Sequence, residues 1–188
     1  MEFSKMNDML KTRLKGTRYR HSIGVCETAV KMAARFGVDV EKARIAGLLH
    51  DCAREFPLEN MRQEAELRHI TYTEIERKMP ILLHAYIGAW LCKERYGVDD
   101  KEIINAVYRH TTGGAGMTAL DKIIYLADMI EPNREYPGVE QLREIVEKES
   151  LNEAVLAGFD RSISFIVRKR RMIHPDTVLA RNEILLRG

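Results

Sequence analysis

The sequence predicts an all-α protein. Apolar residues recur three or four positions apart along most of the chain, the spacing that places them on one face of a helix. Proline, glycine and acidic residues separate these apolar segments at points where helices commonly begin or end. No convincing run of alternating polar and apolar residues indicates a sheet. The 188 residues contain no internal repeat, linker or shift in composition, so we expect one domain, a helical bundle over residues 1–188.

The first half of the chain contains four predicted helices. The first of these helices lies near the N-terminus, and its apolar positions are Phe3, Met6, Leu10 and Leu14. The pattern continues over residues 23–36 and ends at Gly37, since glycine readily adopts the left-handed conformation that closes a helix. Residues 40–51 form the third helix. Pro57 opens the fourth, because proline suits the first turn of a helix.

Proline, glycine and aspartate also mark helix ends in the second half of the chain. Pro80 precedes a predicted helix over residues 81–96, which Gly97 ends, and Asp99 or Asp100 caps the next helix. That helix runs to about His110, after which residues 111–116 break the pattern. The remaining predicted helices cover residues 117–129, 139–148 and 151–172, with a loop at 132–138.

Charge and cysteine usage narrow the class of protein. Thirty basic and 28 acidic side chains leave a formal charge of +2, too balanced to indicate a nucleic-acid or membrane binder. Cys26, Cys52 and Cys92 lie among apolar helical residues, which favours reduced, buried thiols in a cytosolic protein. No apolar run approaches the roughly 18 residues of a membrane span, and no signal-peptide apolar region follows Met1. We expect a soluble, cytoplasmic protein with a small-molecule partner, and its apolar helix faces allow a homodimer.

The doublet His50-Asp51 is the strongest indication of a functional site. Neutral imidazoles and ionised carboxylates bind borderline divalent metals, and the apolar run at residues 45–49 lowers the dielectric beside the doublet. A polar pair at a helix end is the alternative interpretation. Four further residues can complete a metal site around the doublet: His21, His84, His110 and Asp128.

Asp128 and His84 each interrupt an apolar run. An unpaired carboxylate in such surroundings costs on the order of several kcal/mol, so Asp128 requires either a metal ion or a salt bridge to Arg134 or Lys122. His84 is either a ligand or a hydrogen-bonded core histidine. Six candidates exceed the three or four protein ligands of a typical mononuclear site, which allows a dinuclear centre bridged by a carboxylate.

At these positions the chain resembles the HD-domain superfamily of metal-dependent phosphohydrolases. The match comprises His21, the His50-Asp51 doublet and Asp128, in the order of the H, HD, D pattern, with His84 and His110 as the further histidines of the dinuclear branch. Longer segments at residues 20–22, 48–51, 110–113 and 120–134 resemble the bacterial YqeK family of symmetrical bis(5'-nucleosyl)-tetraphosphatases. This resemblance is strongest over residues 17–171.

The resemblance implies an all-α HD domain that splits diadenosine tetraphosphate into two ADP molecules. It implies two divalent metal ions, iron as the first expectation and Mn, Ni, Co or Zn as alternatives. One ion would be held by His21, His50, Asp51 and Asp128. Asp51 would bridge to the second, which His84 and His110 would complete. The hypothesis that follows is attack of a metal-bound hydroxide on a central phosphorus, with Asp51 and Arg54 as catalytic residues.

Arginines near the candidate ligands are predicted to bind the substrate phosphates, because guanidinium groups stabilise spread anionic charge. The candidates are Arg20, Arg54, Arg109 and Arg134, of which Arg54 and Arg134 are the preferred pair. Arg54 departs from the lysine that many HD proteins carry three residues after the aspartate. The hydroxyls of Thr111 and Thr112, with the glycines that follow, can also bind phosphate. Surface ion pairs for the arginines and a plain turn for the glycines are the alternatives.

Other polar motifs are interpreted as structural. Glu66 and His69 have the Glu-x-x-His spacing of diiron carboxylate proteins, but those sites need two such motifs. His69 and His174 are predicted to be surface residues, and the basic run at residues 168–171 a solvated helix end.

Three other functions remain open from the sequence. The same ligands would serve a phosphohydrolase of another nucleotide, such as a nucleoside mono- or triphosphate or guanosine tetraphosphate. A noncatalytic nucleotide sensor or RNA-associated binding module would more simply show a missing ligand, and all six are present. A dinuclear iron enzyme that activates oxygen is the third alternative.

Overall fold

The computed structural model describes residues 1–187, and these residues form helices without any strand. This confirms the predicted all-α class. The helices are α1 (Phe3–Arg13), α2 (Gly16–Phe36), α3 (Val40–Leu49), α4 (Met61–Leu67), α5 (Glu74–Lys78), α6 (Leu83–Glu94), α7 (Lys101–Arg109), α8 (Ala119–Ile130), α9 (Val139–Lys148), α10 (Leu151–Arg168) and α11 (Pro175–Arg187). Short 3-10 segments are η1 (Cys52–Glu55), η2 (Leu58–Asn60) and η3 (Pro80–Leu82).

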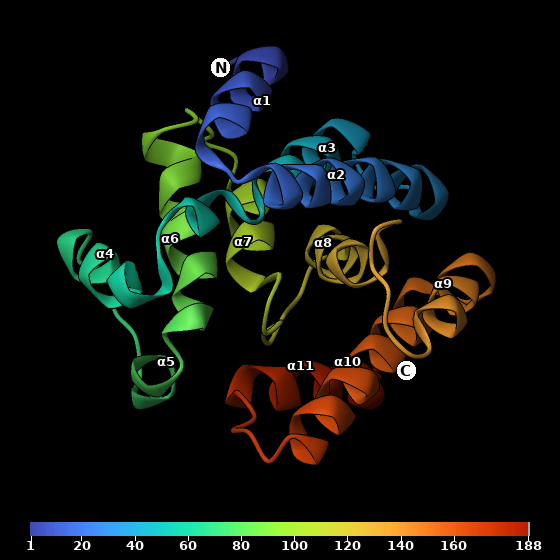
Figure 1. Ribbon diagram of the computed structural model, residues 1–188. Helices are drawn as coiled ribbons and strands as arrows, with labels where there is room; N and C mark the ends of the chain where they lie inside the picture. The colour runs from blue at the N-terminus through green and yellow to red at the C-terminus, as the bar shows by residue number, and fades with distance from the viewer. Residues whose placement is uncertain (188) are drawn as a thin grey trace.

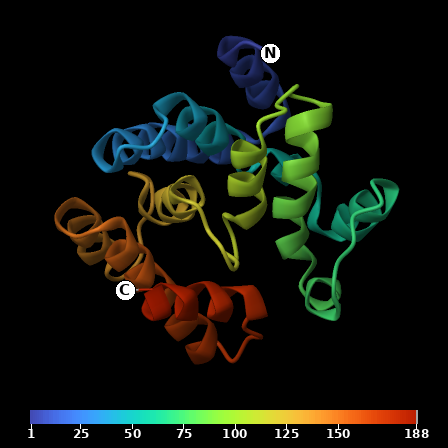
Figure 2. The ribbon, with the colours of Figure 1, turned by 180° about the vertical axis from the view of Figure 1, so that it is seen from behind.

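Helix α8 lies among α2, α3 and α7, with α10 on its other side (Figure 1). Helix α4 packs against α6, and α5 contacts η3, the segment that leads into α6 (Figure 1). Helix α1 and the C-terminal helices α10 and α11 lie at opposite ends of the molecule, which the view from behind also shows (Figure 2). Within residues 1–187 no helix is both long and apolar enough to cross a membrane.

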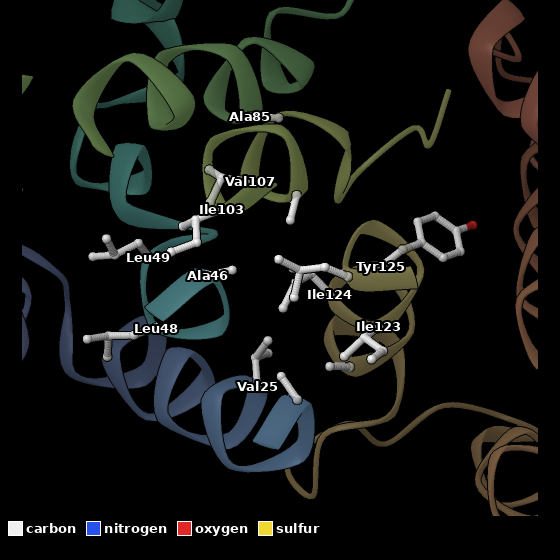
Figure 3. Packing of buried hydrophobic residues seen from close by; sticks show 14 of the residues in the cluster. Val25, Ala46, Leu48, Leu49, Ala85, Ile103, Val107, Ile123, Ile124 and Tyr125 are labelled. Atoms are coloured by element: carbon white, nitrogen blue, oxygen red, sulfur yellow. The ribbon is translucent and has the colours of Figure 1, made fainter. Parts of the chain in front are cut away.

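The core gathers around α8. Figure 3 shows Val25 of α2, Ala46 of α3, Val107 of α7 and Ile124 of α8 pointing toward one another, and all four side chains are fully buried. Removal of such apolar side chains from water is the main favourable contribution to folding. The core therefore fixes the relative positions of the four helices that carry most of the candidate ligands.

Helices α2 and α3 cross closely because Gly47 has no side chain. A Cβ atom at Gly47 would lie 2.9 Å from the Cα of Cys26, too close for any larger residue. This contact holds the C-terminal end of α3, which leads into His50, against α2, which carries His21.

Several predicted helix ends are confirmed. Gly37 and Gly97 have left-handed φ angles of 68° and 63° after α2 and α6. Asp100, rather than Asp99, caps α7, since its carboxylate accepts hydrogen bonds from the backbone of Glu102 and Ile103. Helix α2 begins at Gly16, before Ile23, the first apolar position of the pattern, so His21, expected at the start of this helix, lies inside it.

Two helices were absent from the sequence interpretation. Helix α5 has only five residues, too few for a periodic pattern. Helix α11 begins at Pro175, and the prediction that the last helix ends near residue 172 is wrong. Several of its large apolar residues are exposed, Leu179, Leu185 and Leu186 among them, which obscures the pattern of its buried face.

Helix α11 covers the glycine-rich loop after α7. The hydroxyl of Thr177 donates to the carbonyl of Thr112 at 2.9 Å. Gly113 has a left-handed φ of 71°, and a Cβ there would lie 2.6 Å from the ring of Phe159 in α10. The C-terminal helices thus hold the segment that directly follows His110.

Candidate metal centre

The six predicted ligands converge from five segments of the chain. His21 lies in α2, His84 in α6 and Asp128 in α8, while His50, Asp51 and His110 follow the ends of α3 and α7. The five residues other than Asp128 are at most 7% exposed, and Asp128 is half-buried. Residues up to 107 positions apart in sequence are therefore brought to one centre.

The end of α3 allows two consecutive residues to face this centre. Neighbouring side chains diverge by roughly 100° within a helix. Helix α3 ends at Leu49, and Asp51 has left the α-helical conformation, with φ −106° and ψ 17°, before η1 begins. Nε2 of His50 consequently lies 3.6 Å from Oδ2 of Asp51. The helix predicted over residues 40–51 therefore ends two residues earlier, before the doublet.

The ligand atoms form two groups that share Asp51. One comprises His21, His50 and Asp51, the other Asp51, His84 and His110, and within each group the candidate atoms lie within 4.8 Å of one another. Nε2 of His21 is 3.2 Å from Nε2 of His50, and Nε2 of His84 is 3.1 Å from Nε2 of His110. Asp128 joins the first group, because its Oδ1 lies 2.9 Å from Nε2 of His21.

The four histidines among the candidate ligands all turn Nε2 toward the centre. Each Nδ1 donates a hydrogen bond outward: His21 to Glu131 (3.0 Å), His50 to the carbonyl of Gly47 (2.8 Å), His84 to that of Ile81, and His110 to that of Val107 (2.6 Å). In the neutral imidazole, a proton on Nδ1 leaves Nε2 as an acceptor. Four nitrogen lone pairs and two carboxylates thus face one another, an arrangement that repels unless a cation lies among them. The donor set fits divalent metal ions.

The electrostatics of Asp51, His50 and His110 favour the metal-binding protonation states. Burial lowers the pKa of His50, and burial together with the neighbouring His84 lowers the pKa of His110 to about 3. Burial raises the pKa of Asp51, but His50, His84 and His110 outweigh it and hold the pKa well below its ordinary value. Neutral imidazoles beside ionised carboxylates are the forms that bind metal. For His21, burial lowers the pKa, but the hydrogen bond and charge of Asp128 and the hydrogen bond to Glu131 outweigh burial and raise it.

Asp128 also has a cationic partner. Arg134 forms an ion pair with its carboxylate and donates from Nε to its backbone carbonyl at 2.7 Å. Lys122 instead donates to Asn152 at 2.7 Å. The predicted salt bridge to Arg134 is therefore present, and the same half-buried carboxylate also lies beside the candidate ligand His21.

The predicted phosphate-binding residues differ in their surroundings. Arg54 is half-buried in η1, close to Asp51, and burial lowers its pKa. Arg20 is exposed. Arg109 donates to Asp121 at 2.9 Å and to the carbonyl of Gly116 at 3.0 Å, so its guanidinium also holds the glycine-rich loop.

The two threonines of that loop also differ. The hydroxyl of Thr111 lies 3.1 Å from Nε2 of His110 and 3.3 Å from Nε2 of His84, at the edge of the centre. Thr112 is 6% exposed and contacts α11 through its carbonyl. Of the pair, Thr111 is the one placed beside the ligands.

Two residues at the centre were not predicted as site residues. Arg18 donates to Oδ2 of Asp51 at 2.8 Å. Glu131, 1% exposed, accepts from Nδ1 of His21 and from both the backbone and the side chain of Asn133 at 2.8 Å. Arg18 precedes His21 by three residues and Glu131 follows Asp128 by three, so spacing of one helical turn from a ligand was the available signal.

The prediction that His174 is a surface residue is wrong. His174 is 8% exposed, and its Nε2 lies 2.5 Å from Oε1 of Glu76, which is 1% exposed. The partners are 98 residues apart, a contact that local sequence does not show. His69 is exposed, as predicted, and so are residues 168–171. The three cysteines are free and buried, also as predicted.

The chain belongs to the HD domain family, whose model matches residues 18–133. More particularly, it is 40% identical over 173 residues to a Bacillus subtilis (strain 168) protein named bis(5'-nucleosyl)-tetraphosphatase, symmetrical, with 92% of each chain covered. A protein of the same name from Halalkalibacterium halodurans is 37% identical and covers 99% of this chain. These matches confirm the resemblance predicted from the motifs.

The fold has a similar solved structure. The crystal structure of a protein from Clostridium acetobutylicum, described as a predicted HD superfamily hydrolase involved in NAD metabolism, superimposes with a TM-score of 0.94. It is 40% identical and covers the whole of this chain. The helical arrangement around the candidate centre is therefore that of an HD superfamily hydrolase.

Proposed function

We propose that this protein is an enzyme that hydrolyses bis(5'-nucleosyl) tetraphosphates symmetrically, so that diadenosine tetraphosphate gives two ADP. The observation that carries the proposal is the buried centre in which four Nε2 atoms and two carboxylates face one another beside several arginines. The names of the B. subtilis and H. halodurans relatives, which cover almost the whole chain, supply the substrate class.

Two divalent ions, with iron as the first expectation and Mn, Ni, Co or Zn as alternatives, are the proposed cofactors. His21, His50, Asp51 and Asp128 would hold one, and Asp51, His84 and His110 the other, because the two groups share Asp51. When bound, such ions lower the pKa of water and offset negative charge on phosphoryl oxygens. The contacts of the four Nδ1 atoms keep the imidazoles oriented for this role.

The arginines around the centre would bind the tetraphosphate. Arg54 and Arg134 are the preferred contacts, and Arg18, which lies against Asp51, joins them. Guanidinium groups can bind two phosphate oxygens at once, and their charge offsets the charge that builds on the bridging oxygen during cleavage. In this proposal Asp51 and Arg54 are catalytic residues, and Thr111 contacts a phosphate at the edge of the centre. Arg20 is exposed enough to meet the substrate, while Arg109 and Thr112 would contribute through the loop they hold.

We also propose a cytoplasmic location and a small-molecule partner for this protein. Three free, buried thiols support a reducing, cytoplasmic location. The nearly balanced charge favours a small nucleotide over nucleic acid as the partner. A homodimer and a single domain over residues 1–188 complete the proposal.

Product analysis tests the function. Protein of known metal content is incubated with diadenosine tetraphosphate, and the nucleotides are separated by chromatography. We expect ADP alone, and an Asp51→Ala variant carried through the same purification should lose both metal and turnover. AMP with ATP would overturn symmetrical cleavage. Orthophosphate released from simple nucleotides, with no cleavage of the dinucleotide, would move the assignment to another nucleotide phosphohydrolase.

A further inference from the structure

Two cavities of nearly equal size meet at Arg18. The first, about 370 Å³, is bordered by α2 and the segment after α8, and the second, about 380 Å³, by the start of α2 and the chain from η1 to η3. Thr17 and Arg18 line both. Arg18 also donates to Oδ2 of Asp51 at 2.8 Å, so a residue that lines both cavities contacts the residue shared by the two ligand groups.

The first cavity has polar walls, and we call it the polar cavity. Its lining includes the guanidinium groups of Arg18, Arg20 and Arg134 but no aliphatic or aromatic side chain other than the imidazole of His21. Its one carboxylate, that of Glu131, is already hydrogen-bonded to His21 and Asn133. Such a surface suits phosphate oxygens.

The second cavity has an apolar wall, and we call it the base cavity. Phe56, Leu58, Met61 and Ile81 line it, with Arg54, Arg18 and Lys15 on the side nearer the centre or the start of α2. Leu58 and Ile81 are 52% and 36% exposed, so their side chains are available to a ligand. The carboxylate of Glu55 in this cavity is paired with Arg13 at 3.2 Å and with Arg95.

The two cavities differ in the polarity of their walls, and this difference determines which part of a nucleotide each can bind. A purine ring gains most of its binding free energy from contact with apolar and aromatic side chains, whereas phosphates need cationic donors. Of the two cavities that share Arg18, only the base cavity offers the first kind of surface. The substrate is chemically symmetrical about its central bridge, but these two cavities differ from each other.

We propose that the enzyme recognises only one nucleoside of its substrate, in the base cavity, and holds the other half through phosphates in the polar cavity. The proposal rests on the function proposed above. It extends the substrate class to nucleoside 5'-tetraphosphates, which lack the second nucleoside. Water would add across the bond between the second and third phosphates, the bridging P–O bond would break, and the products would be a nucleoside diphosphate and inorganic pyrophosphate, with no change in oxidation state.

The first test compares two substrates with wild-type protein. Adenosine 5'-tetraphosphate should give ADP and pyrophosphate with a kcat/KM within about tenfold of that for diadenosine tetraphosphate, since the second adenosine makes few contacts. A kcat/KM more than about 100-fold lower, while the dinucleotide still gives ADP alone, would overturn one-sided recognition and leave the proposed function intact. Failure to cleave diadenosine tetraphosphate would instead remove the function on which the inference rests.

The second test changes side chains of the base cavity and no candidate ligand, and Ile81→Ala keeps the backbone carbonyl that accepts from His84. In the double variant Leu58→Ala/Ile81→Ala, we expect kcat/KM to fall about tenfold for both adenosine substrates, because apolar contact area is lost. Hydrolysis of inorganic tetrapolyphosphate, which has no base, should not change relative to wild type. Leu67→Ala is the matched control, since Leu67 is 67% exposed and lies outside the cavity.

Binding provides a readout that is independent of turnover. Calorimetric titration with ADP should show weaker binding by the double variant than by Leu67→Ala, at equal metal content and equal thermal stability. Equal ADP affinity in the two variants would place the base elsewhere and overturn the assignment. A loss confined to the dinucleotide substrate would show that the altered wall meets the second nucleoside, which also contradicts the proposal.

Discussion

Oε1 of Glu131 lies 3.0 Å from Nδ1 of His21 and thereby determines which nitrogen of that imidazole faces the candidate centre. Glu131 is 1% exposed, and its other oxygen is fully engaged with Asn133. A carboxylate in this position accepts the Nδ1 proton and increases the basicity of Nε2. Glu131 therefore acts on the centre through His21, as a positioning residue.

Replacement of Glu131 by Gln should weaken metal binding by about 10- to 100-fold, because the neutral amide is a poorer acceptor for the Nδ1 proton. Metal affinity is measured by titration in metal-buffered solution. Glu140→Gln is the control, since Glu140 has a side chain that is 74% exposed and pairs with Arg143 on the surface of α9. Equal metal affinity in the two variants would show that the contact with His21 does not position the ligand.

A substitution at Gly24 also tests the contact between Glu131 and His21. A Cβ atom at Gly24 would lie 2.3 Å from Oε2 of Glu131, so Gly24→Ala must move the carboxylate. The charge of Glu131 is unchanged in this variant. We expect metal affinity to fall by about tenfold, because a group that orients a metal ligand has moved. Gly16→Ala, where a Cβ meets nothing within 4 Å, is the control. Retention of full metal affinity by Gly24→Ala would indicate that Glu131 relocates without consequence for His21.

Arg54 offers a test of substrate contact as distinct from metal binding. Arg54→Lys keeps the charge but loses the planar fork, so we expect kcat/KM to fall about tenfold, and Arg54→Ala about 100-fold or more. Metal content should remain that of wild type in both variants. Arg62→Ala, an exposed position on α4, is the control for loss of an arginine. Loss of metal in Arg54→Lys would contradict a role confined to the substrate.

Most helices, and the candidate ligands that the fold brings together, could be picked out from local features of the sequence. Apolar spacing marked most helices, and Asp128 and His84 stood out as polar residues within apolar runs. The uses of Arg109 and His174 were not predictable. Arg109 precedes a candidate ligand directly, yet Asp121 and Gly116 engage its guanidinium. The sequence beside Pro175 indicated that His174 faces solvent, but in the fold His174 contacts Glu76 of α5. The partners of Arg109 and His174 are set by the fold, and residue spacing along the chain does not identify them.

The pair of Glu76 and His174 makes a contribution to stability that depends on pH. Burial raises the pKa of Glu76, but hydrogen bonds from Thr73 and His174 outweigh it and lower the pKa from 4.5 to about 2. A depressed carboxyl pKa stabilises the folded state above the unfolded value, and the contribution disappears as pH falls from about 4.5 to about 2. The shift corresponds to about 3 kcal/mol at neutral pH.

Glu76→Gln should therefore lower the free energy of unfolding by about 2 to 3 kcal/mol at pH 7, as measured by urea denaturation. The difference from wild type should shrink as the pH is lowered through 4.5, because the wild-type carboxylate then takes up the proton that removes its advantage. Glu74→Gln is the matched control. Glu74 lies in the same helix α5, its side chain is 65% exposed, and it pairs only with Arg77 and Lys78 on the surface, so its loss should cost less than about 1 kcal/mol. A difference between Glu76→Gln and wild type that stays constant from pH 7 to pH 3 would mean that packing, rather than the ionised carboxylate, accounts for the stability. That result would contradict the role assigned to the contact between Glu76 of α5 and His174.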